Sequence, residues 1–189
     1  AIVVVHIFGY PSEMGEIMEI AKKHKLAVVE DCAQSFGALH NGKVVGSIGD
    51  TGSFSFYPTK VLGCYGDGGM ITTNRDDLNE DIRRLRNHGA VKPFVRTEIG
   101  MNSRLDEIQA ALLRLKLRTI DRDIDGRRAV AAEYTKRFAG SPVKPPGTSR
   151  WSAVKPGGRS VEGSTGRASS EGVSTSSGTV ARSDPGTGS

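Results

Sequence analysis

SFSFYPTKVLGCYGDGG, residues 53–69, is the stretch from which the fold is predicted. Phe54 and Phe56 alternate with small polar residues, as in a short half-buried strand, and Pro58 ends that strand. Lys60 follows on the turn. Rigid backbone and partly apolar surroundings can keep a lysine uncharged and nucleophilic, so Lys60 is a candidate for Schiff-base chemistry. The alternative is an ordinary solvated loop lysine.

A second stretch, LAVVEDCAQ at residues 26–34, predicts a buried strand of the parallel type. Its apolar residues lead into Glu30 and Asp31, so the strand presents a carboxylate at its C-terminal end. Open α/β sheets bind ligands at that end. Asp31 and Lys60 therefore both lie at predicted strand ends, and Gln34 follows Asp31 by one turn.

The chain before this strand predicts a β-α-β unit. Residues 2–8 are an apolar strand, and a helix capped by Ser12 follows as far as Lys25. Such units build parallel sheets, so the predicted fold class is α/β, with a mostly parallel sheet and flanking helices. His6 is expected either to line a site or to be a hydrogen-bonded structural histidine.

Glycines cluster after Lys60, at Gly63, Gly66, Gly68 and Gly69. They do not form a phosphate-binding loop, because no Lys-Ser or Lys-Thr follows and the next element is the strand MITT. A dinucleotide-binding domain would require G-x-G-x-x-G after a strand, which is absent. We interpret the glycines as a tight turn that allows close backbone approach near the lysine.

The second half of the chain is predicted to be helical. A loop at residues 90–100 is expected to place Phe94 and Val95 against a partner. Ser103 is predicted to open a helix, and a further helix is predicted from Ile120 to Phe138. The apolar face of the helix from Ser103 is expected to comprise Leu105, Ile108, Ala111, Leu112 and Leu115 and to pack in the core or at an interface.

Two regions are predicted from the local composition: a structured region at residues 1–140 and a Gly/Ser-rich tail at 141–189. The tail has a single aromatic residue, Trp151, and no apolar period. It cannot bury enough surface to offset the entropy of ordering, so we expect it to be disordered.

Composition limits the function classes. The chain has 189 residues and a formal charge of +5, and its basic residues, Arg127 and Arg128 among them, are interleaved with acids as on solvated helix faces. Aromatic residues are 6% of the chain, which argues against nucleic-acid binding. No apolar run approaches membrane-spanning length, and two cysteines make no disulfide framework or metal motif. We expect a cytoplasmic protein with no metal.

Four segments, taken in order, resemble the DegT/DnrJ/EryC1/StrS family of sugar aminotransferases, which use pyridoxal 5'-phosphate and have fold type I. These segments are EDCAQSFGA, GSIGDTGSFSFYPTK, GDGGMITTN and GMNSRLDEIQAALLRLKL. The E-D-x-A-Q and S-F-x-P-T-K motifs together carry the resemblance, which extends over residues 2–140. It implies a partial large domain of that fold.

The resemblance also implies roles for individual residues. Lys60 matches the lysine that bonds covalently to the cofactor, and Asp31 the carboxylate that pairs with the pyridine nitrogen. Gln34 matches the residue beside the ring hydroxyl, and Ser55 the hydroxyl that contacts the phosphate. Asn102 matches an asparagine that reaches the phosphate from the neighbouring subunit, although an asparagine before a helix is also an ordinary cap.

The implied reaction is transamination of a nucleotide-linked keto sugar, with glutamate or glutamine as amino donor. The full-length parent protein is expected to be a homodimer. Relatives that act as sugar dehydratases with pyridoxamine phosphate carry histidine where Lys60 stands, so Lys60 argues against that alternative. A second alternative is a non-catalytic fragment that serves at most in dimer contacts. The chain has no initiator methionine, and we expect a truncated piece that holds cofactor weakly and does not turn over.

Overall fold

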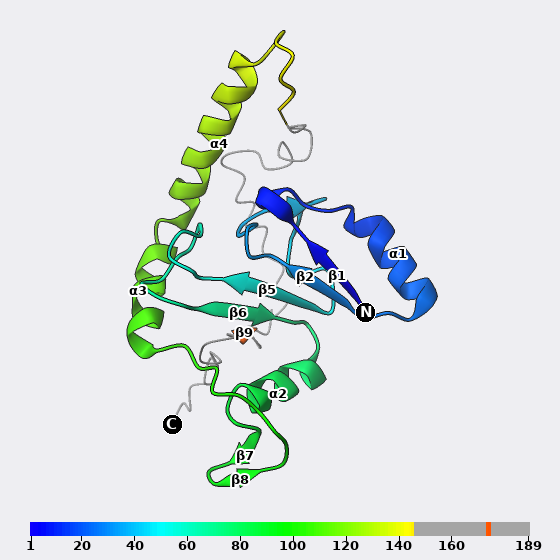
Figure 1. Ribbon diagram of the computed structural model, residues 1–189, viewed down its shortest axis with the longest axis vertical. Helices are drawn as coiled ribbons and strands as arrows, with labels where there is room; N and C mark the ends of the chain where they lie inside the picture. Colours follow the sequence, from blue (N-terminus) through cyan, green and yellow to red (C-terminus); the bar gives the residue numbers. More distant parts are fainter. Residues whose placement is uncertain (146–172, 175–189) are drawn as a thin grey trace, which may run out of the picture.

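The computed structural model describes residues 1–145 and 173–174 (Figure 1). Its centre is a five-stranded sheet in the order β1-β2-β5-β6-β9. The strands of this sheet are β1 (Ile2–Val5), β2 (Val28–Asp31), β5 (Thr51–Ser55), β6 (Gly69–Thr72) and β9 (Val173–Ser174). β1, β2 and β5 are parallel, and β6 and β9 are antiparallel to their neighbours. The predicted α/β class is confirmed.

The register of the sheet defines its two faces. Val4 pairs with Glu30 and Glu30 with Gly52, so these positions share one face, which also includes Val28 and Phe54. We call it the buried face. Val5 pairs with Asp31 and Asp31 with Ser53, which defines the open face, on which Ser55 follows Ser53. Val3 and Val5 on the open face are 66% and 46% exposed.

Two apolar clusters cover the buried face. Helix α1 (Met14–His24) packs Met14 and Ala21 against Val4 and Val28. Phe54 and Phe56 belong to a second cluster. That cluster also contains Leu62, Leu105, Leu113 and Ile120. Burying several such side chains at about 1.5–3 kcal/mol each is the main stabilisation of the sheet.

Helix α1 does not begin as predicted. Its N-cap is Glu13, and neither Glu13 nor Ser12 makes a side-chain cap hydrogen bond. Ser12 instead donates its hydroxyl to the carbonyl of Val5, 3.1 Å away. The chain between β1 and α1 contains a short 3-10 turn, η1 (Ile7–Gly9), so the predicted strand at residues 2–8 ends early.

The connection from β2 to β5 contains a hairpin of β3 (Leu39–His40) and β4 (Lys43–Val44). Asn41 and Gly42 at its tip both have positive φ, which confirms the predicted hairpin turn. Residues 90–100, predicted as a loop, contain a second hairpin of β7 (Ala90–Lys92) and β8 (Val95–Arg96). That prediction missed the strands because Pro93 and Phe94 form the turn between them.

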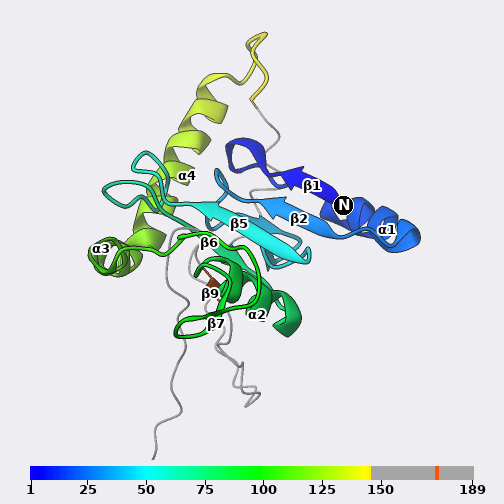
Figure 2. The ribbon, with the colours of Figure 1, turned by 60° about the horizontal axis from the view of Figure 1, so that its bottom comes forward.

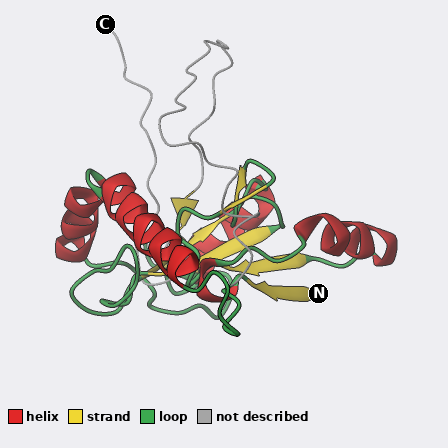
Figure 3. Ribbon diagram, turned by 90° about the horizontal axis from the view of Figure 1, so that it is seen from above, coloured by secondary structure: helices red, strands yellow, loops and turns green. Residues whose placement is uncertain are grey.

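The remaining helices are α2 (Asp76–Leu85), α3 (Glu107–Leu117) and α4 (Ile120–Arg137). Figure 2 shows α2 beside β7, below the sheet. In Figures 1 and 3, α1 lies at one end of the molecule and α3 with α4 at the other, with the strands between them. None of the helices among the described residues is long and apolar enough to cross a membrane.

Helix α3 differs from its prediction in start and in orientation. It begins at Glu107, not at Ser103, and Leu105 is buried ahead of it. Leu113 is its buried residue, whereas Ile108 is 75% exposed and Leu115 57%. The predicted apolar face is therefore not the side that is buried within this chain, because apolar residues surround the helix and Leu113 lies on its buried side.

The tail predicted to be disordered falls mostly on residues 146–172 and 175–189, which lie outside the described residues. Within the tail the structure describes 141–145 and β9, which pairs with β6 through Val173 and Ser174. The boundary predicted at residue 140 follows the end of α4 by three residues.

Candidate functional site

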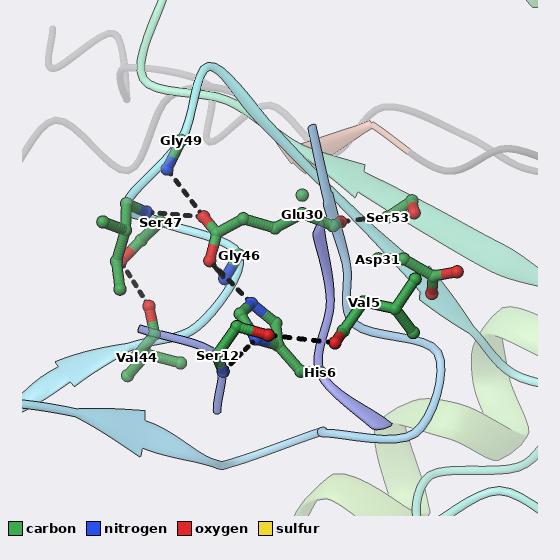
Figure 4. Close-up of polar contacts among 12 residues, drawn as sticks. Val5, His6, Ser12, Glu30, Asp31, Val44, Gly46, Ser47, Gly49 and Ser53 are labelled. Carbon is green, nitrogen blue, oxygen red and sulfur yellow. Dashed lines mark hydrogen bonds and ion pairs between the residues drawn. The ribbon is translucent and has the colours of Figure 1, made fainter. Parts of the chain in front are cut away.

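A buried carboxylate, Glu30, lies behind the sheet edge that carries the candidate site (Figure 4). Its Oε1 accepts the backbone N–H groups of Ile48 and Gly49, at 2.8 and 2.7 Å. Its Oε2 accepts the N–H of Gly46 at 2.9 Å and contacts Nε2 of His6 at 3.0 Å. Burial raises the pKa of Glu30, but the hydrogen bonds from His6 and the three amides outweigh it and leave the pKa below its usual value.

His6 is the structural histidine of the two predicted alternatives. It is fully buried, and its Nδ1 accepts the backbone N–H of Ser12 at 3.1 Å. Because Nδ1 is an acceptor, Nε2 carries the proton and donates a hydrogen bond to Glu30. The pair links the end of β1 to β2 and to the loop before β5.

Cys32 lies close enough to His6 and Glu30 to suggest a metal site, with ligand atoms within 4.8 Å of one another. The chemistry argues against it. Both oxygens of Glu30 and both nitrogens of His6 already have partners. Burial and the nearby charge of Glu30 also raise the pKa of Cys32 to about 12, so this thiol is protonated when no metal is bound.

A cavity of about 470 Å³ opens at the C-terminal ends of the three parallel strands. Segments that follow β1, β2 and β5 supply most of its walls, and α4 supplies the rest. The lining residues are Phe8, Gly9, Pro11, Ala33 to Leu39, Ser55 and Thr59 to Val61, with Ile124, Arg127 and Arg128 from α4. Ligands of open α/β sheets bind at this edge, so the cavity is the candidate site.

Three of the predicted site residues meet in this cavity: Lys60, Ser55 and Gln34. Lys60 is half-buried on the turn after β5, and its backbone N–H donates a hydrogen bond to the carbonyl of Tyr57 at 2.9 Å. Gln34 is held in place because its Oε1 accepts the N–H of Phe8 at 2.8 Å. The hydroxyl of Ser55 accepts the N–H of Tyr57 at 3.2 Å, which leaves its proton free to donate.

Gly63 explains how the Lys60 turn folds so tightly. A Cβ at this position would lie 2.5 Å from the carbonyl oxygen of Pro58 and 2.9 Å from that of Tyr57. The backbone after Lys60 therefore returns against the backbone before it, as the glycine cluster predicts.

Asp31 is not among the residues that line the cavity, but it lies on the same face of the sheet as Ser55. Figure 4 shows its side chain directed away from Glu30. Its Oδ1 accepts the N–H of Ala33 at 3.0 Å, and Ala33 itself lines the cavity. The half-buried carboxylate thus adjoins the cavity at the end of β2.

Asn102 lies apart from the other four residues. It forms a β-bridge with Asn87, and its Oδ1 accepts a hydrogen bond from Nε of Arg104 at 3.0 Å. It does not cap α3, whose N-cap is Asp106.

Sequence reasoning missed two features of this region. Glu30 follows Val28 at the inward spacing of a strand, and that alternation could have marked it as a buried carboxylate that needs partners. Arg127 and Arg128 were predicted to be on a solvated face, yet both line the cavity. No signal in the sequence distinguishes them from the other basic residues of α4, because their position depends on tertiary packing.

The alignments with known relatives cover most of this chain but only part of each relative. It is 54% identical over 138 residues to the dTDP-3-amino-3,6-dideoxy-alpha-D-galactopyranose transaminase of Aneurinibacillus thermoaerophilus, covering 73% of this chain and 38% of that protein. It is 47% identical over 146 residues to the UDP-N-acetyl-3-dehydro-alpha-D-glucosamine 3-aminotransferase of Acidithiobacillus ferrooxidans, covering 77% and 40%.

A solved structure shows the same partial match. The crystal structure of DesV from S. venezuelae matches with a TM-score of 0.72 and 43% identity, over 76% of this chain and 40% of that one. The chain therefore spans about 40% of the length of these relatives. A sequence profile of the DegT/DnrJ/EryC1/StrS aminotransferase family matches residues 1–158. The motifs at Asp31 and Lys60, the sheet that positions them and these similarities lead to one conclusion: the chain belongs to the DegT/DnrJ/EryC1/StrS aminotransferase family.

Proposed function

We propose that this chain carries the cofactor-binding lysine and carboxylate of a pyridoxal-phosphate-dependent aminotransferase that acts on a nucleotide-linked keto sugar. The observation that carries the proposal is the cavity at the strand ends, where Lys60, Ser55 and Gln34 meet and which Asp31 adjoins on the same sheet face. The structured region at residues 1–140 is proposed to be part of the large domain.

The residues present fit pyridoxal phosphate. Its phosphate is an anion, and the described residues that line the cavity include no Asp or Glu. A hydroxyl, an amine and an amide also line the cavity, in Ser55, Lys60 and Gln34. When bound, the cofactor withdraws electrons from the substrate carbon that loses a proton.

Each residue has a role that the family resemblance implies and that its chemistry fits. Asp31 would keep the pyridine nitrogen protonated, since an anion there favours the protonated ring. The amine of Lys60 would hold the cofactor and would move a proton at the substrate carbon. The hydroxyl of Ser55 would hold the phosphate, and Gln34, fixed by the Phe8 amide, would hold the ring hydroxyl.

Asn102 is proposed to act in a neighbouring subunit, which agrees with its place away from this cavity. The surface beside it supports a homodimer. Exposed apolar side chains near it in the sequence include Phe94, Ile99, Met101 and Ile108, which favour burial against another protein surface. The second copy is proposed to supply Asn102 to this site.

The substrate class is proposed from the relatives. Their names specify dTDP-linked and UDP-linked amino sugars. Glutamate or glutamine is the proposed amino donor, and a cytoplasmic location agrees with the two free, buried cysteines, Cys32 and Cys64.

Covalent trapping tests the proposal on the chain itself. Purified protein is incubated with pyridoxal phosphate, reduced with borohydride and digested, and the labelled peptide is identified by mass spectrometry. Label is expected on Lys60 and is lost in Lys60→Ala. Lys43→Ala, which removes an exposed lysine outside the cavity, is the matched control and retains the label.

The trapping result also separates the alternatives. Label spread over surface lysines, with no preference for Lys60, would indicate a non-catalytic module that serves only in dimer contacts. Selective label on Lys60 with no amino transfer would agree with the cofactor-binding half of a longer enzyme.

A further inference from the structure

One wall of the cavity has no task in the proposed chemistry. Lys60, Ser55 and Gln34 reach the cavity from segments that follow β5 and β2. Arg127 and Arg128 reach it from α4, a separate element. Both side chains line the cavity, so this one helix contributes two guanidinium groups to its lining.

The charge of the cavity favours an anion. Its described lining holds Lys60 and the two arginines but no acidic residue. A cleft lined by one sign of charge, with apolar walls, raises the local concentration of ions of the other sign. Phe8, Phe36, Val61 and Ile124 provide such walls.

The two arginines retain donors for a ligand. Among the described residues, Arg127 takes part in no ion pair. Arg128 donates one hydrogen bond, from Nη1 to Asp125 at 3.0 Å, and its side chain is 35% exposed. A guanidinium has five N–H donors in a planar fork that matches phosphate oxygens.

We propose that Arg127 and Arg128 form a subsite for the diphosphate of the nucleotide-linked sugar; the choice of ligand rests on the proposed function. Two guanidinium groups in one cavity match a ligand group with two or more negative charges better than they match a single carboxylate. The cavity volume lies within the range of small-molecule sites. The sugar end of the substrate then faces the Lys60 part of the same cavity.

Calorimetric titration with dTDP tests the subsite on the full chain. The double variant Arg127→Ala, Arg128→Ala is expected to bind dTDP at least about tenfold more weakly than the wild type, since charge-assisted hydrogen bonds are lost. Wild-type binding is expected to weaken as salt is added. Arg122→Ala is the matched control, because this arginine lies on α4 outside the cavity, 80% exposed and paired with Asp123, and its removal leaves the affinity unchanged.

Folding is checked by circular dichroism. Alanine is a good helix former, so the double variant should retain α4, and Arg127→Lys, Arg128→Lys should restore part of the affinity. Equal dTDP affinity in the wild type and the double variant overturns the proposal, as does a wild type that does not bind dTDP. The proposal is also overturned if pyridoxal phosphate abolishes the binding of dTDP, because the arginines would then hold the cofactor phosphate.

The borohydride label on Lys60 is measured on the same samples, so the two proposals fail separately. A labelled Lys60 with arginine-independent dTDP binding leaves the proposed function standing and removes the subsite. Arginine-dependent dTDP binding without label on Lys60 supports an anion subsite and removes the proposed function.

Discussion

The two faces of the central sheet differ in what their side chains do. On the buried face, Val4, Val28 and Phe54 pack in apolar clusters, and the carboxylate of Glu30 has a partner for each oxygen. On the open face, Val3 and Val5 are exposed, and Asp31 has one local hydrogen bond. The same strands thus supply stability on one face and the proposed chemistry on the other.

Adjacent residues in one strand show this difference most directly. Glu30 and Asp31 are both carboxylates, but the alternation of a strand places them on opposite faces. Their neighbours, not their own chemistry, set their roles. Substitutions on the two faces should therefore separate the stability of the protein from its ability to bind a cofactor.

The largest effect is expected from the apolar core. Phe54→Ala should lower the free energy of unfolding by about 3–5 kcal/mol, because it leaves a cavity beside Phe36 and Gly46. Urea unfolding measures the change. Val3→Ala on the open face should cost under about 0.5 kcal/mol. Similar losses in both variants would show that the two faces are equally packed.

The next largest effect is expected from the buried carboxylate, Glu30. Glu30→Gln should lower the free energy of unfolding by about 3 kcal/mol, since a neutral amide cannot accept all four hydrogen bonds as well and its NH₂ group opposes a buried donor.

Asp31→Asn is the matched control for that substitution. It should change stability by about 1 kcal/mol or less, but it should weaken binding of pyridoxal phosphate, as measured by cofactor absorbance. A destabilisation by Asp31→Asn as large as that of Glu30→Gln would contradict the assignment of the two faces.

The turn at Lys60 should show an intermediate effect. Gly63→Ala should lower the free energy of unfolding by about 1–3 kcal/mol, because its Cβ would meet the carbonyls of Pro58 and Tyr57. Gly66→Ala is the control, since its Cβ would meet only Nε2 of Gln109, at 3.5 Å. Displacement of the turn by Gly63→Ala should also reduce labelling of Lys60, and unchanged labelling would show that the lysine does not depend on this approach.

The smallest change in stability is expected when the pH is lowered. The pKa of Glu30 is lower in the folded protein than its value of 4.5 in the unfolded chain, so its contribution to stability is complete above pH 4.5. It is lost as the pH falls through the folded pKa. Thermal unfolding between pH 6 and pH 3 should show this decrease, and Glu30→Gln should flatten it. A wild-type profile with no decrease would mean that Glu30 is not held as an anion.

Sequence reasoning located the elements of the site well, and its failures have a common cause. The strand that ends at Asp31 was predictable from its apolar run, and the strand at Ser55 from its alternating aromatics and Pro58, because these are local signals. The orientation of α3 was not, because apolar residues surround that helix and only packing selects Leu113 as the buried one. Arg127 and Arg128 were missed for the same reason, since a contact between α4 and the loops after β2 and β5 has no local signature.

The two neighbouring carboxylates of β2 have a consequence for how the strand finds its partners. If β2 slipped by one residue against β1 and β5, Glu30 and Asp31 would exchange faces. The shorter side chain would then be trapped among apolar groups, and the amides of Gly46, Ile48 and Gly49 would be left without an anion. Such a misaligned state is strongly disfavoured, so the pair marks the correct alignment during folding and selects it before any cofactor binds.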